Sequence, residues 1–379
     1  MSRDGRAARI LAHVTEGASA ERVLFVRLSA MGDVLQCLPA LAALRAARPD
    51  AQLGWVVERR FAGLVEGHAA LDRVFVWERR KGGSAFANAG ALARLRADLR
   101  AWRPHVALDL QGNLRGALVA RLSGAPRRIA LPGGEAREGA QRFATETAAP
   151  AADPREHRSA RALRLVAAYL GDASAAAVSA DPPADVLPPV ADAARAAVRA
   201  ALDGAGLRGR TFAVFVAGTS DFGAFKRWPA ERFGALARRL TEDTGWAVLV
   251  SHGPGQEPLA AEIAACSGGA ARPAPPTRSL AELRALLDEA ALVVGADSGP
   301  VVLAGLAGRP TVALFGPKDP EVYAPRGAAT AVVWKGVYCS PCALRRCDDP
   351  ICMTRLDEDA AWDGMRRAVA LARRGGDAA

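Results

Sequence analysis

The sequence has few aromatic residues and no long apolar run. Phenylalanine, tryptophan and tyrosine make up 6% of the 379 residues, and no basic segment carries stacking side chains at regular intervals. Surfaces that bind single-stranded nucleic acid need both features, so we expect no nucleic-acid partner. No stretch approaches the roughly 18 consecutive apolar residues of a transmembrane helix. Residues 1–23 carry charges throughout and lack the apolar core of a signal peptide, so we expect a cytoplasmic protein.

The chain does have an excess of positive charge, with a formal net charge of +10 at pH 7. Such an excess favours an anionic partner, for example a nucleotide or an acidic lipid surface. Half of the residues are hydrophobic and 24% are charged, which is typical of a globular protein. Because 379 residues exceed the usual size of a single core, we expect two domains.

Short apolar stretches alternate with helix-length segments in both halves, which predicts two parallel sheets. The segment 171–190 between the halves is rich in alanine, aspartate and proline, as linkers are. We therefore predict an α/β chain with two Rossmann-like domains, residues 1–185 and 186–379. The predicted strands are 23–28, 53–57, 74–77, 106–110, 212–216, 247–250, 292–295 and 311–315.

The first predicted strand runs into a helix through a Ser-x-x-Gly-Asp turn, which places Asp33 at the carboxyl end of that strand. Ligands bind at this edge in open α/β sheets. An acidic residue at the start of a helix also caps the helix and is stabilised by its dipole. Asp33 is therefore either a catalytic carboxylate or a helix cap.

A second strand end carries groups that suit a diphosphate. Thr219 and Ser220 follow the strand 212–216, and Lys226 precedes the next helix. Hydroxyls, free backbone amides and an ammonium group together can bind a pyrophosphate. The segment is equally compatible with an ordinary strand-to-helix loop that has Pro229 at the first helical turn. Only four of the 50 basic residues are lysines, which makes a lysine in this loop more informative than elsewhere.

A third strand end has the sequence Gly-Ala-Asp-Ser-Gly at 295–299, again where a helix opens. Its free backbone amides predict an anion site of the same kind. Asp297 could orient a sugar hydroxyl or cap the helix.

Polar and basic residues also follow the strands of the first half. Arg59, Arg60 and Arg115 carry guanidinium groups that suit carboxylates and phosphates, although each could be a solvated surface arginine. The motif Asp-Leu-Gln-Gly-Asn offers Gln111 and Asn113 as hydrogen-bond partners for a sugar.

Five motifs in order extend over both halves: VRLSAMGDVLQCLPAL, DLQGNLRGAL, GTS with KRWPAERF, GADSGPVVLAGLAG, and CSPCALRRC. Together they resemble the heptosyltransferases of glycosyltransferase family 9, and the resemblance covers residues 22–355. It implies a GT-B fold, in which two Rossmann-like domains with parallel sheets face a central cleft. It also implies an inverting, metal-independent reaction, with the acceptor bound by the first domain and an ADP-activated heptose by the second.

The resemblance assigns roles to residues of this sequence. It implies that Asp33 is the general base. The loop that binds the donor phosphates is matched by Thr219, Ser220 and Lys226, and the acid that contacts the ribose resembles Glu257. The motif that holds heptose and diphosphate is matched by Asp297, Ser298 and Gly299. Val302 departs from the family, which often has a histidine at this position.

Two acidic or sulfur-rich segments raise the question of a metal. Four of the six cysteines have the spacing C-x₂-C-x₄-C-x₄-C, which is compatible with structural zinc but tighter than common zinc ribbons. The segment Asp-Glu-Asp at 357–359 matches the Asp-x-Asp of metal-dependent glycosyltransferases, yet its place before the last helix favours capping. We expect no catalytic metal. The cysteines are Cys339, Cys342, Cys347 and Cys352.

The resemblance implies transfer of heptose from ADP-L-glycero-D-manno-heptose to a lipopolysaccharide inner-core acceptor, either Kdo-lipid A or a heptosyl group. It implies no cofactor. Arg59, Arg60, Gln111, Asn113 and Arg115 are then the candidates for binding the acceptor. We expect a monomer with peripheral contact at the cytoplasmic face of the inner membrane, favoured by the net positive charge. Two alternatives remain: a different nucleotide-sugar donor, or a nucleotide-sugar-binding protein with weak catalysis.

Overall fold

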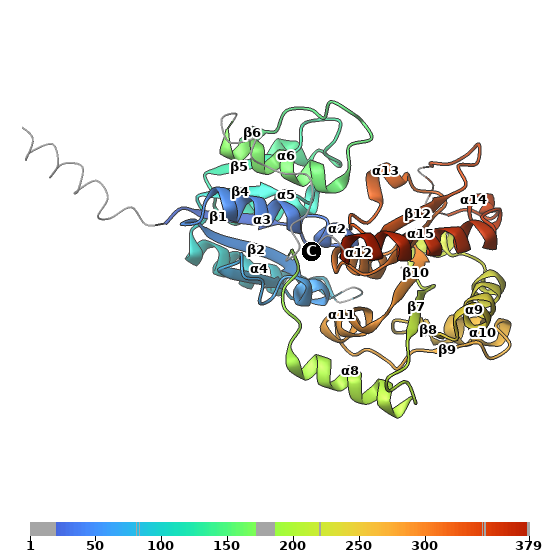
Figure 1. Ribbon diagram of the computed structural model, residues 1–379. Coiled ribbons are helices and arrows are strands. Elements are labelled where there is room, and N and C mark those ends of the chain that lie inside the picture. The colour runs from blue at the N-terminus through green and yellow to red at the C-terminus, as the bar shows by residue number, and fades with distance from the viewer. Residues whose placement is uncertain are drawn as a thin grey trace, which may run out of the picture.

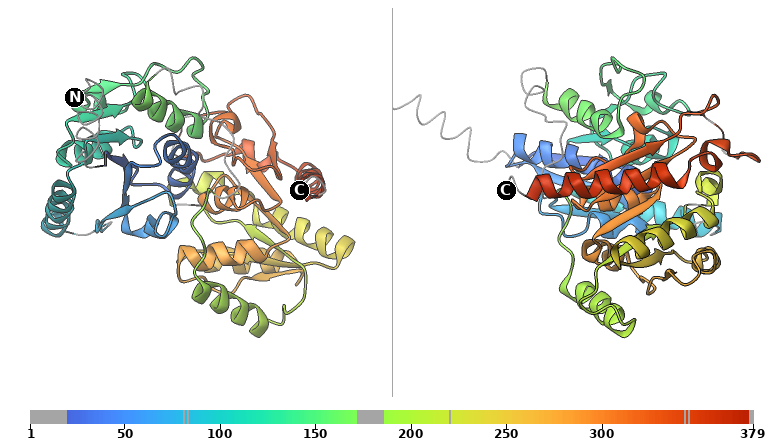
Figure 2. Two further views of the ribbon diagram at one scale, coloured as in Figure 1. Left: turned by 60° about the vertical axis from the view of Figure 1, so that its left-hand side comes forward. Right: turned by 45° about the vertical axis from the view of Figure 1, so that its right-hand side comes forward.

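Two six-stranded parallel sheets, one in each half of the chain, form the framework of the protein (Figure 1). In this computed structural model the described residues are 20–80, 82, 84–171, 186–219, 221–342, 344 and 346–376. The two halves lie side by side, as the left view of Figure 2 also shows. The predicted domain boundary falls at 185, and the segment 172–185 lies outside the described residues.

The first sheet has the strand order β3-β2-β1-β4-β5-β6, and all of its pairs are parallel. The strands β2 and β3 therefore follow β1 on one side, and β4, β5 and β6 follow on its other side. Its strands are β1 (Arg22–Val26), β2 (Gln52–Glu58), β3 (Arg73–Trp77), β4 (Val106–Asp109), β5 (Arg127–Ala130) and β6 (Glu146–Thr147).

The second sheet repeats this plan with the order β12-β11-β10-β7-β8-β9, and its pairs are again parallel. Here the reversal lies between β7 and β10. Its strands are β7 (Phe212–Val216), β8 (Ala247–Ser251), β9 (Ala271–Pro273), β10 (Leu292–Ala296), β11 (Thr311–Phe315) and β12 (Thr330–Trp334).

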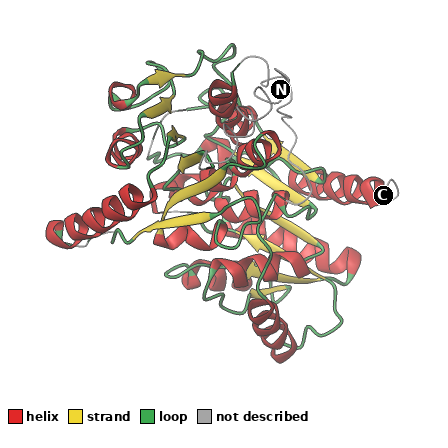
Figure 3. Cartoon of the chain, turned by 90° about the vertical axis from the view of Figure 1, so that its left-hand side faces the viewer, coloured by secondary structure: helices red, strands yellow, loops and turns green. Residues whose placement is uncertain are grey.

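Each sheet is covered by helices on both faces (Figure 3), which explains why its strands are continuous apolar runs. In β1, Val23 and Phe25 belong to one core, whereas Leu24 and Val26 belong to the core on the opposite face. Alternate side chains of a strand point to opposite faces, so both sets are removed from water.

The helices of the first half cover its sheet in two layers, with α4 and α5 on one face and α2, α3 and α6 on the other. They are α2 (Met31–Leu35), α3 (Leu38–Ala47), α4 (Ala85–Trp102), α5 (Leu114–Leu122) and α6 (Arg158–Leu170), with the 3₁₀ segments η1 (Arg59–Leu64) and η2 (Ala140–Phe143).

In the second half, α9, α10 and α15 pack on one face of the sheet, and α8, α11 and α12 contribute to the core on the other. None of the described helices is long and apolar enough to cross a membrane. The helices are α8 (Asp192–Gly204), α9 (Ala230–Thr244), α10 (Glu257–Cys266), α11 (Leu280–Glu289), α12 (Gly299–Leu306), α13 (Pro320–Tyr323), α14 (Ile351–Thr354) and α15 (Glu358–Gly376), with the 3₁₀ segment η3 (Asp221–Lys226).

The halves touch where α2 meets the start of α12. A Cβ atom at Gly299 would lie 2.5 Å from Cγ of Met31, far inside van der Waals contact, so only glycine permits this approach. A Cβ atom at Gly32 would lie 3.6 Å from Cγ2 of Val302. Val302 is buried in the same core, so the position that often holds a histidine in the family forms an apolar contact between the halves here.

All eight predicted strands are confirmed as β1 to β4, β7, β8, β10 and β11. The remaining four strands were not predicted from the sequence. Two of them are only two and three residues long, and β5 begins with two arginines that are not buried. The fourth, β12, alternates buried and half-buried residues because it pairs on one side only. The edge strands β6, β9 and β12 lack the unbroken apolar run that identifies a central parallel strand.

Candidate active site

The reversals of strand order mark one edge in each sheet. In open α/β sheets, ligands bind beyond the carboxyl ends of the two strands where the order reverses. These strands are β1 and β4 in the first sheet, and β7 and β10 in the second. Asp33 follows β1, and Asp297 follows β10. The candidate site is thus composed of the loops at these two edges.

Asp33 is the third residue of α2, and its carboxylate makes two contacts. Its Oδ2 lies 2.7 Å from Nη2 of Arg27, a buried arginine just after β1. The same oxygen accepts a 3.4 Å hydrogen bond from the backbone N–H of Ala30, the residue before the helix. The capping contact is therefore present, and it leaves the side chain 31% exposed. Capping and availability to a substrate do not exclude each other.

The surroundings of Asp33 keep it ionised. Burial raises the pKa of the carboxyl, but the charges of Arg27 and Arg158 and the hydrogen bonds from Ala30 and Arg27 outweigh burial and lower the pKa below its ordinary value. The carboxylate is consequently ready to accept a proton at neutral pH. The lowered pKa also makes it a weaker base than a free aspartate.

The loop between β1 and α2, which positions Asp33, is hydrogen-bonded to the Asp-Leu-Gln-Gly-Asn motif after β4. Oε1 of Gln111 accepts hydrogen bonds from the backbone N–H groups of Leu28, at 2.9 Å, and Ser29, at 3.3 Å. Asn113 caps α5, since its Oδ1 accepts a 3.2 Å bond from Gly116 N–H. Both predicted acceptor residues thus organise backbone, and Gln111 also lines the cavity beside Asp33.

Asp109 supports the same motif from inside the protein. Its Oδ1 accepts hydrogen bonds from the N–H groups of Gln111, at 3.1 Å, and Gly112, at 3.2 Å. Burial raises the pKa of this carboxyl to about 6, although both bonds and the charge of Arg27 act to lower it. Gly112 has φ of +64°, a left-handed conformation that glycine adopts without strain.

The predicted arginines of the first half fall into two groups. Arg60 and Arg115 both lie 3.0 Å from Glu58, a carboxylate that is 3% exposed, and Arg79 lies 3.8 Å from it. Arg59 pairs instead with Glu78, at 2.6 Å. The structure therefore gathers Arg60 and Arg115 around one buried anion and places Arg59 in a separate surface pair.

At the second edge the structure joins two predicted donor residues. Nζ of Lys226 lies 2.6 Å from Oδ2 of Asp297, and the two side chains are 21% and 15% exposed. Thr219 is buried, and its hydroxyl donates a 2.8 Å bond to the backbone oxygen of Gly223. The backbone oxygen of Thr219 accepts another 2.8 Å bond, from Nε2 of Gln256.

The other predicted donor residues have different surroundings. Ser298 precedes α12, and its buried hydroxyl has no hydrogen-bond partner among the described residues. Gly299 begins α12 in contact with the first half. Glu257 is exposed at the first position of α10, beyond the carboxyl end of β8. Ser220 lies outside the described residues.

The segments that suggested a metal have the following arrangement. The described part of the chain contains no group of three or more His, Cys, Asp or Glu side chains placed to hold a metal ion. All four clustered cysteines are free thiols; burial and the nearby thiols raise the pKa of Cys352 to about 11. Oδ1 of Asp357 accepts a 2.8 Å bond from Ala360 N–H, which confirms that this acid caps the last helix.

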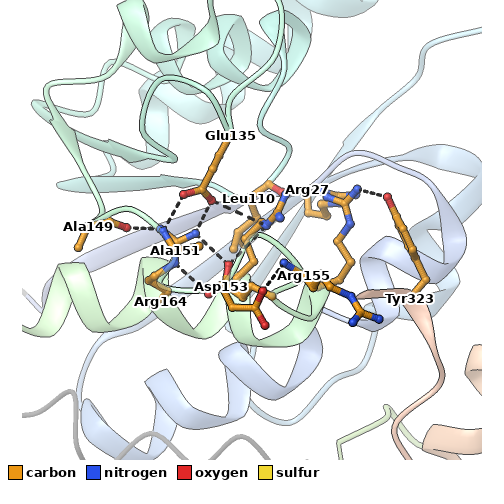
Figure 4. A network of polar contacts seen from close by, with 12 residues as sticks. Arg27, Leu110, Glu135, Ala149, Ala151, Asp153, Arg155, Arg164 and Tyr323 are labelled. Carbon is orange, nitrogen blue, oxygen red and sulfur yellow. Dashed lines mark hydrogen bonds and ion pairs between the residues drawn. The ribbon is translucent and has the colours of Figure 1, made fainter. Parts of the chain in front are cut away.

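A cavity of about 220 Å³ opens beside Asp33. Most of its polar side chains were not predicted from the sequence, because they come from the loop after β5, from α6 and, in the case of Tyr323, from α13 of the other half. Figure 4 shows part of this network, with Tyr323 reaching from the second half toward arginines of the first. The ionisable residues of the cavity are Arg27, Asp33, Cys37, Glu135, Arg137, Arg158, Arg161 and Tyr323.

Comparison with known proteins identifies the family of the chain. A model of glycosyltransferase family 9 (heptosyltransferase) matches residues 92–351, which is more than half of the chain. The chain belongs to glycosyltransferase family 9. A lipopolysaccharide heptosyltransferase 1 from Pseudomonas aeruginosa is 29% identical over 365 residues, covering 89% of this chain and 94% of the relative.

Solved structures of the family have the same architecture. The Escherichia coli heptosyltransferase WaaC with ADP has a TM-score of 0.70 and 25% identity, covering 92% of this chain and 99% of that one. The same enzyme with ADP-2-deoxy-2-fluoro heptose has a TM-score of 0.65 and 27% identity, covering 91% and 99%. The predicted GT-B fold of family 9 is therefore confirmed.

Proposed function

We propose that this protein is an inverting heptosyltransferase that uses ADP-L-glycero-D-manno-heptose as donor and a lipopolysaccharide inner-core sugar as acceptor, without a metal or cofactor. The named relatives support the substrates, since one is a lipopolysaccharide heptosyltransferase and another was solved with ADP and a fluorinated ADP-heptose. The observation that carries the proposal is the ionised carboxylate of Asp33, which lies at the β1/β4 edge and lines a cavity. The donor edge begins directly across the α2–α12 contact.

In the proposed reaction, Asp33 accepts the proton of an acceptor hydroxyl as its oxygen attacks the anomeric carbon of the heptose. The bond from that carbon to the diphosphate breaks, and ADP leaves with the bonding electrons. Because one displacement takes place on the face opposite the leaving group, the anomeric configuration inverts. A positioned carboxylate typically contributes 10²- to 10⁴-fold to such a step.

The leaving diphosphate needs positive charge and N–H donors as its own charge develops. Lys226 supplies an ammonium group, and the free amides at the start of α12 supply donors beside Ser298 and Gly299. In the free protein Lys226 is neutralised by Asp297, so the incoming phosphates compete with that carboxylate. We assign Thr219 and Ser220 to the phosphate loop.

The remaining assignments concern the parts of the substrates farther from the reacting atoms. We assign Glu257, which is exposed beyond β8, to the ribose. Asp297 then orients the heptose once Lys226 has turned to the phosphates. Residues 186–379 form the donor domain in this proposal.

On the acceptor side, the proposal assigns residues 1–185 to an acceptor domain. The guanidinium group of Arg60 and that of Arg115 are held at the strand edge by Glu58 and retain exposed N–H groups for anionic oxygens. Arg59, Gln111 and Asn113 are secondary candidates, since Arg59 belongs to a separate surface pair and the side-chain oxygens of the two amides bind backbone N–H groups. The net charge of +10 supports peripheral binding of a monomer to an anionic membrane.

The test is calorimetric titration of the purified protein with ADP-heptose in the absence of added metal, with ADP, UDP-glucose and GDP-mannose as controls. We expect selective binding of the two ADP compounds, tighter when heptose is attached. A preference for another nucleotide sugar would overturn the donor assignment. No binding of any of the four would favour the alternative of a protein without transferase activity.

A further inference from the structure

Helix α5 carries an apolar strip on its outer face. Leu114 is 43% exposed and Leu118 is 38% exposed. They are four positions apart, and the exposed Arg121 follows three positions after Leu118, so these side chains share one face of the helix. The other face is buried on the first sheet through Val119 and Ala120. Two large apolar side chains are therefore neighbours at the surface, on adjacent turns of one helix.

No other described helix has such a pair. The remaining large apolar side chains that are exposed in the described part of the chain are Leu371, which is alone on α15, and Tyr338 and Leu344, which lie in the segment of the clustered cysteines. Exposed apolar residues that are scattered singly are ordinary, whereas contiguous ones mark a surface that contacts a partner. The outer face of α5 is thus suited to contact an apolar layer.

Arginines without acidic partners surround the strip. α5 contains no acidic residue, and η2, which packs against it, carries the exposed Arg142. Arg128 lies on β5, where its Nε donates a 2.8 Å bond to the backbone oxygen of Phe143 in η2. Burial, followed by the charge of Arg121, lowers the pKa of Arg128. Among the described residues Arg121, Arg128 and Arg142 form no ion pair, so their charges are not neutralised.

The positive border continues at the far end of α5. Nε of the exposed Arg100, on α4, donates a 3.3 Å bond to a backbone oxygen in the last turn of α5. The acids on the neighbouring segments are already engaged. Glu138 accepts a 3.2 Å hydrogen bond from Leu114 N–H, and Glu146 forms a bidentate pair with Arg127, at 2.9 and 3.0 Å. The surface around the strip therefore has an excess of positive charge.

The strip begins beside the candidate active site. Gln111 and Gly112, which line the cavity of Asp33, lie just before α5 in the chain. At 1.5 Å per residue, the outer face from Leu114 to Arg121 extends about 10 Å from there. An acceptor anchored in a bilayer has to reach Asp33 while its lipid stays in the membrane. The surface that faces the bilayer must therefore adjoin this cavity.

We propose that the outer face of α5 docks on a lipid bilayer with anionic headgroups. The two leucines enter the headgroup region, and the exposed arginines around them bind lipid phosphates. Apolar insertion and charge attraction both contribute to interfacial binding. The inference rests on the proposed function, which supplies a lipid-linked acceptor, and it adds the surface by which the protein meets that lipid. The docking surface is composed of Leu114, Leu118, Arg100, Arg121 and Arg142.

The test measures cosedimentation of the full-length protein with vesicles of phosphatidylglycerol and phosphatidylethanolamine that contain no acceptor. Vesicles of phosphatidylcholine serve as the uncharged comparison. One double variant, Arg121→Gln with Arg142→Gln, removes charge from the docking surface. A second double variant, Leu114→Gln with Leu118→Gln, removes its apolar part. Thermal unfolding and calorimetric titration with ADP verify that each variant is folded.

Two matched controls change the same residue types in the other half of the molecule. Arg199, on α8, is 65% exposed and pairs with Glu289. Leu371, on α15, is 37% exposed, close to the value for Leu118. Arg199→Gln and Leu371→Gln should therefore report any general effect of losing a surface arginine or leucine.

We expect the wild type to bind the anionic vesicles, and to bind them less tightly at high salt. One arginine near an anionic surface is worth about fivefold in affinity, so the charge variant should bind about 20-fold more weakly. The leucine variant should bind about tenfold more weakly or worse, because the apolar insertion is lost. Both controls should stay within twofold of the wild type.

The inference is overturned if either double variant binds within twofold of the wild type, or if a control loses as much. Equal binding of the wild type to phosphatidylcholine vesicles would also overturn it. Sedimentation velocity without vesicles tests a second copy of the chain as the occupant. A wild-type dimer that the leucine variant dissociates would assign the face to self-association and overturn docking on lipid.

The vesicle experiment also separates this inference from the proposed function, because it needs neither donor nor acceptor. Vesicle binding that depends on the α5 residues supports the docking surface even if the wild type transfers no heptose. Heptose transfer to a water-soluble acceptor, with no binding to anionic vesicles, supports the proposed function and refutes the docking surface.

Discussion

The two strand edges of the candidate site carry their charges differently. At the first edge, Asp33 lies among guanidinium groups that outnumber the acids. At the second edge, one ammonium and one carboxylate, Lys226 and Asp297, neutralise each other at 2.6 Å. The first edge is therefore prepared for an anion, whereas the second must open an internal ion pair before it can hold one. Acceptor and donor binding should respond to mutation in opposite ways.

The largest effect is expected at the base. Asp33→Ala removes the proton acceptor at the first edge, so kcat should fall about 10²-fold or more. The affinity for ADP-heptose, measured by calorimetry, should stay within about twofold of wild type, because the donor edge is intact. Near-normal turnover of Asp33→Ala in a steady-state transfer assay would eliminate this residue as the base.

The next largest effect is expected on ADP affinity, where substitutions of Lys226 and Asp297 should act in opposite directions. Lys226→Ala should weaken ADP binding by about 10- to 100-fold, the equivalent of one charge-assisted hydrogen bond. Asp297→Asn should tighten ADP binding, because it removes the carboxylate that competes for Lys226. Calorimetry with ADP, which lacks heptose, isolates this competition from contacts with the sugar. Weaker ADP binding in both variants would mean that the pair acts as one structural unit.

A third prediction concerns the support of the first edge. The pKa of Asp109 is raised to about 6, above its unfolded value near 3.8. The folded state is therefore not penalised below pH 3.8, and it loses stability as the pH rises through 6, by at most about 3 kcal/mol. Asp109→Asn keeps an oxygen for the two backbone N–H groups, so it should raise Tm at pH 7 and change it little at pH 4. An equal change in Tm at both pH values would contradict this assignment.

The smallest expected effect is on pH dependence. Arg158 helps to lower the pKa of Asp33, so Arg158→Gln should raise that pKa. The acidic limb of the profile of kcat/KM against pH should then move to higher pH. Arg199→Gln is the matched control, and its profile should coincide with that of wild type. A limb that moves to lower pH in Arg158→Gln would show that Arg158 does not act on Asp33 through its charge.

The sequence was most informative where structure is local. Buried parallel strands are apolar on both faces, so eight of the twelve strands in the two sheets could be predicted from single stretches of sequence. Asp33, Lys226 and Asp297 could likewise be selected one at a time from the turns that carry them. Their partners could not, because Lys226 and Asp297 are 71 positions apart and only the parallel order of β7 and β10 brings them together.

The cavity beside Asp33 shows the limit of that approach. Tyr323 lies on a four-residue helix without a motif, and its contact with Arg158 spans 165 positions across both halves. A weak signal did exist, since α6 carries Arg158, Arg161 and Arg164 at intervals of three on an otherwise mostly apolar helix. Residues three apart share one helix face. Such a stripe indicates a basic surface but not the cavity that it lines.

The contact between Met31 and Gly299 has a consequence for the reaction itself. It ties the helix that carries Asp33 to the helix whose first amides are assigned to the diphosphate, so a displacement of one is passed to the other. A side chain at position 299 would act as a spacer between them. Misplacement of reacting groups by about 1 Å can cost 10²-fold in rate. The absence of a Cβ atom at position 299 thus keeps the helix that carries Asp33 close to the helix assigned to the diphosphate.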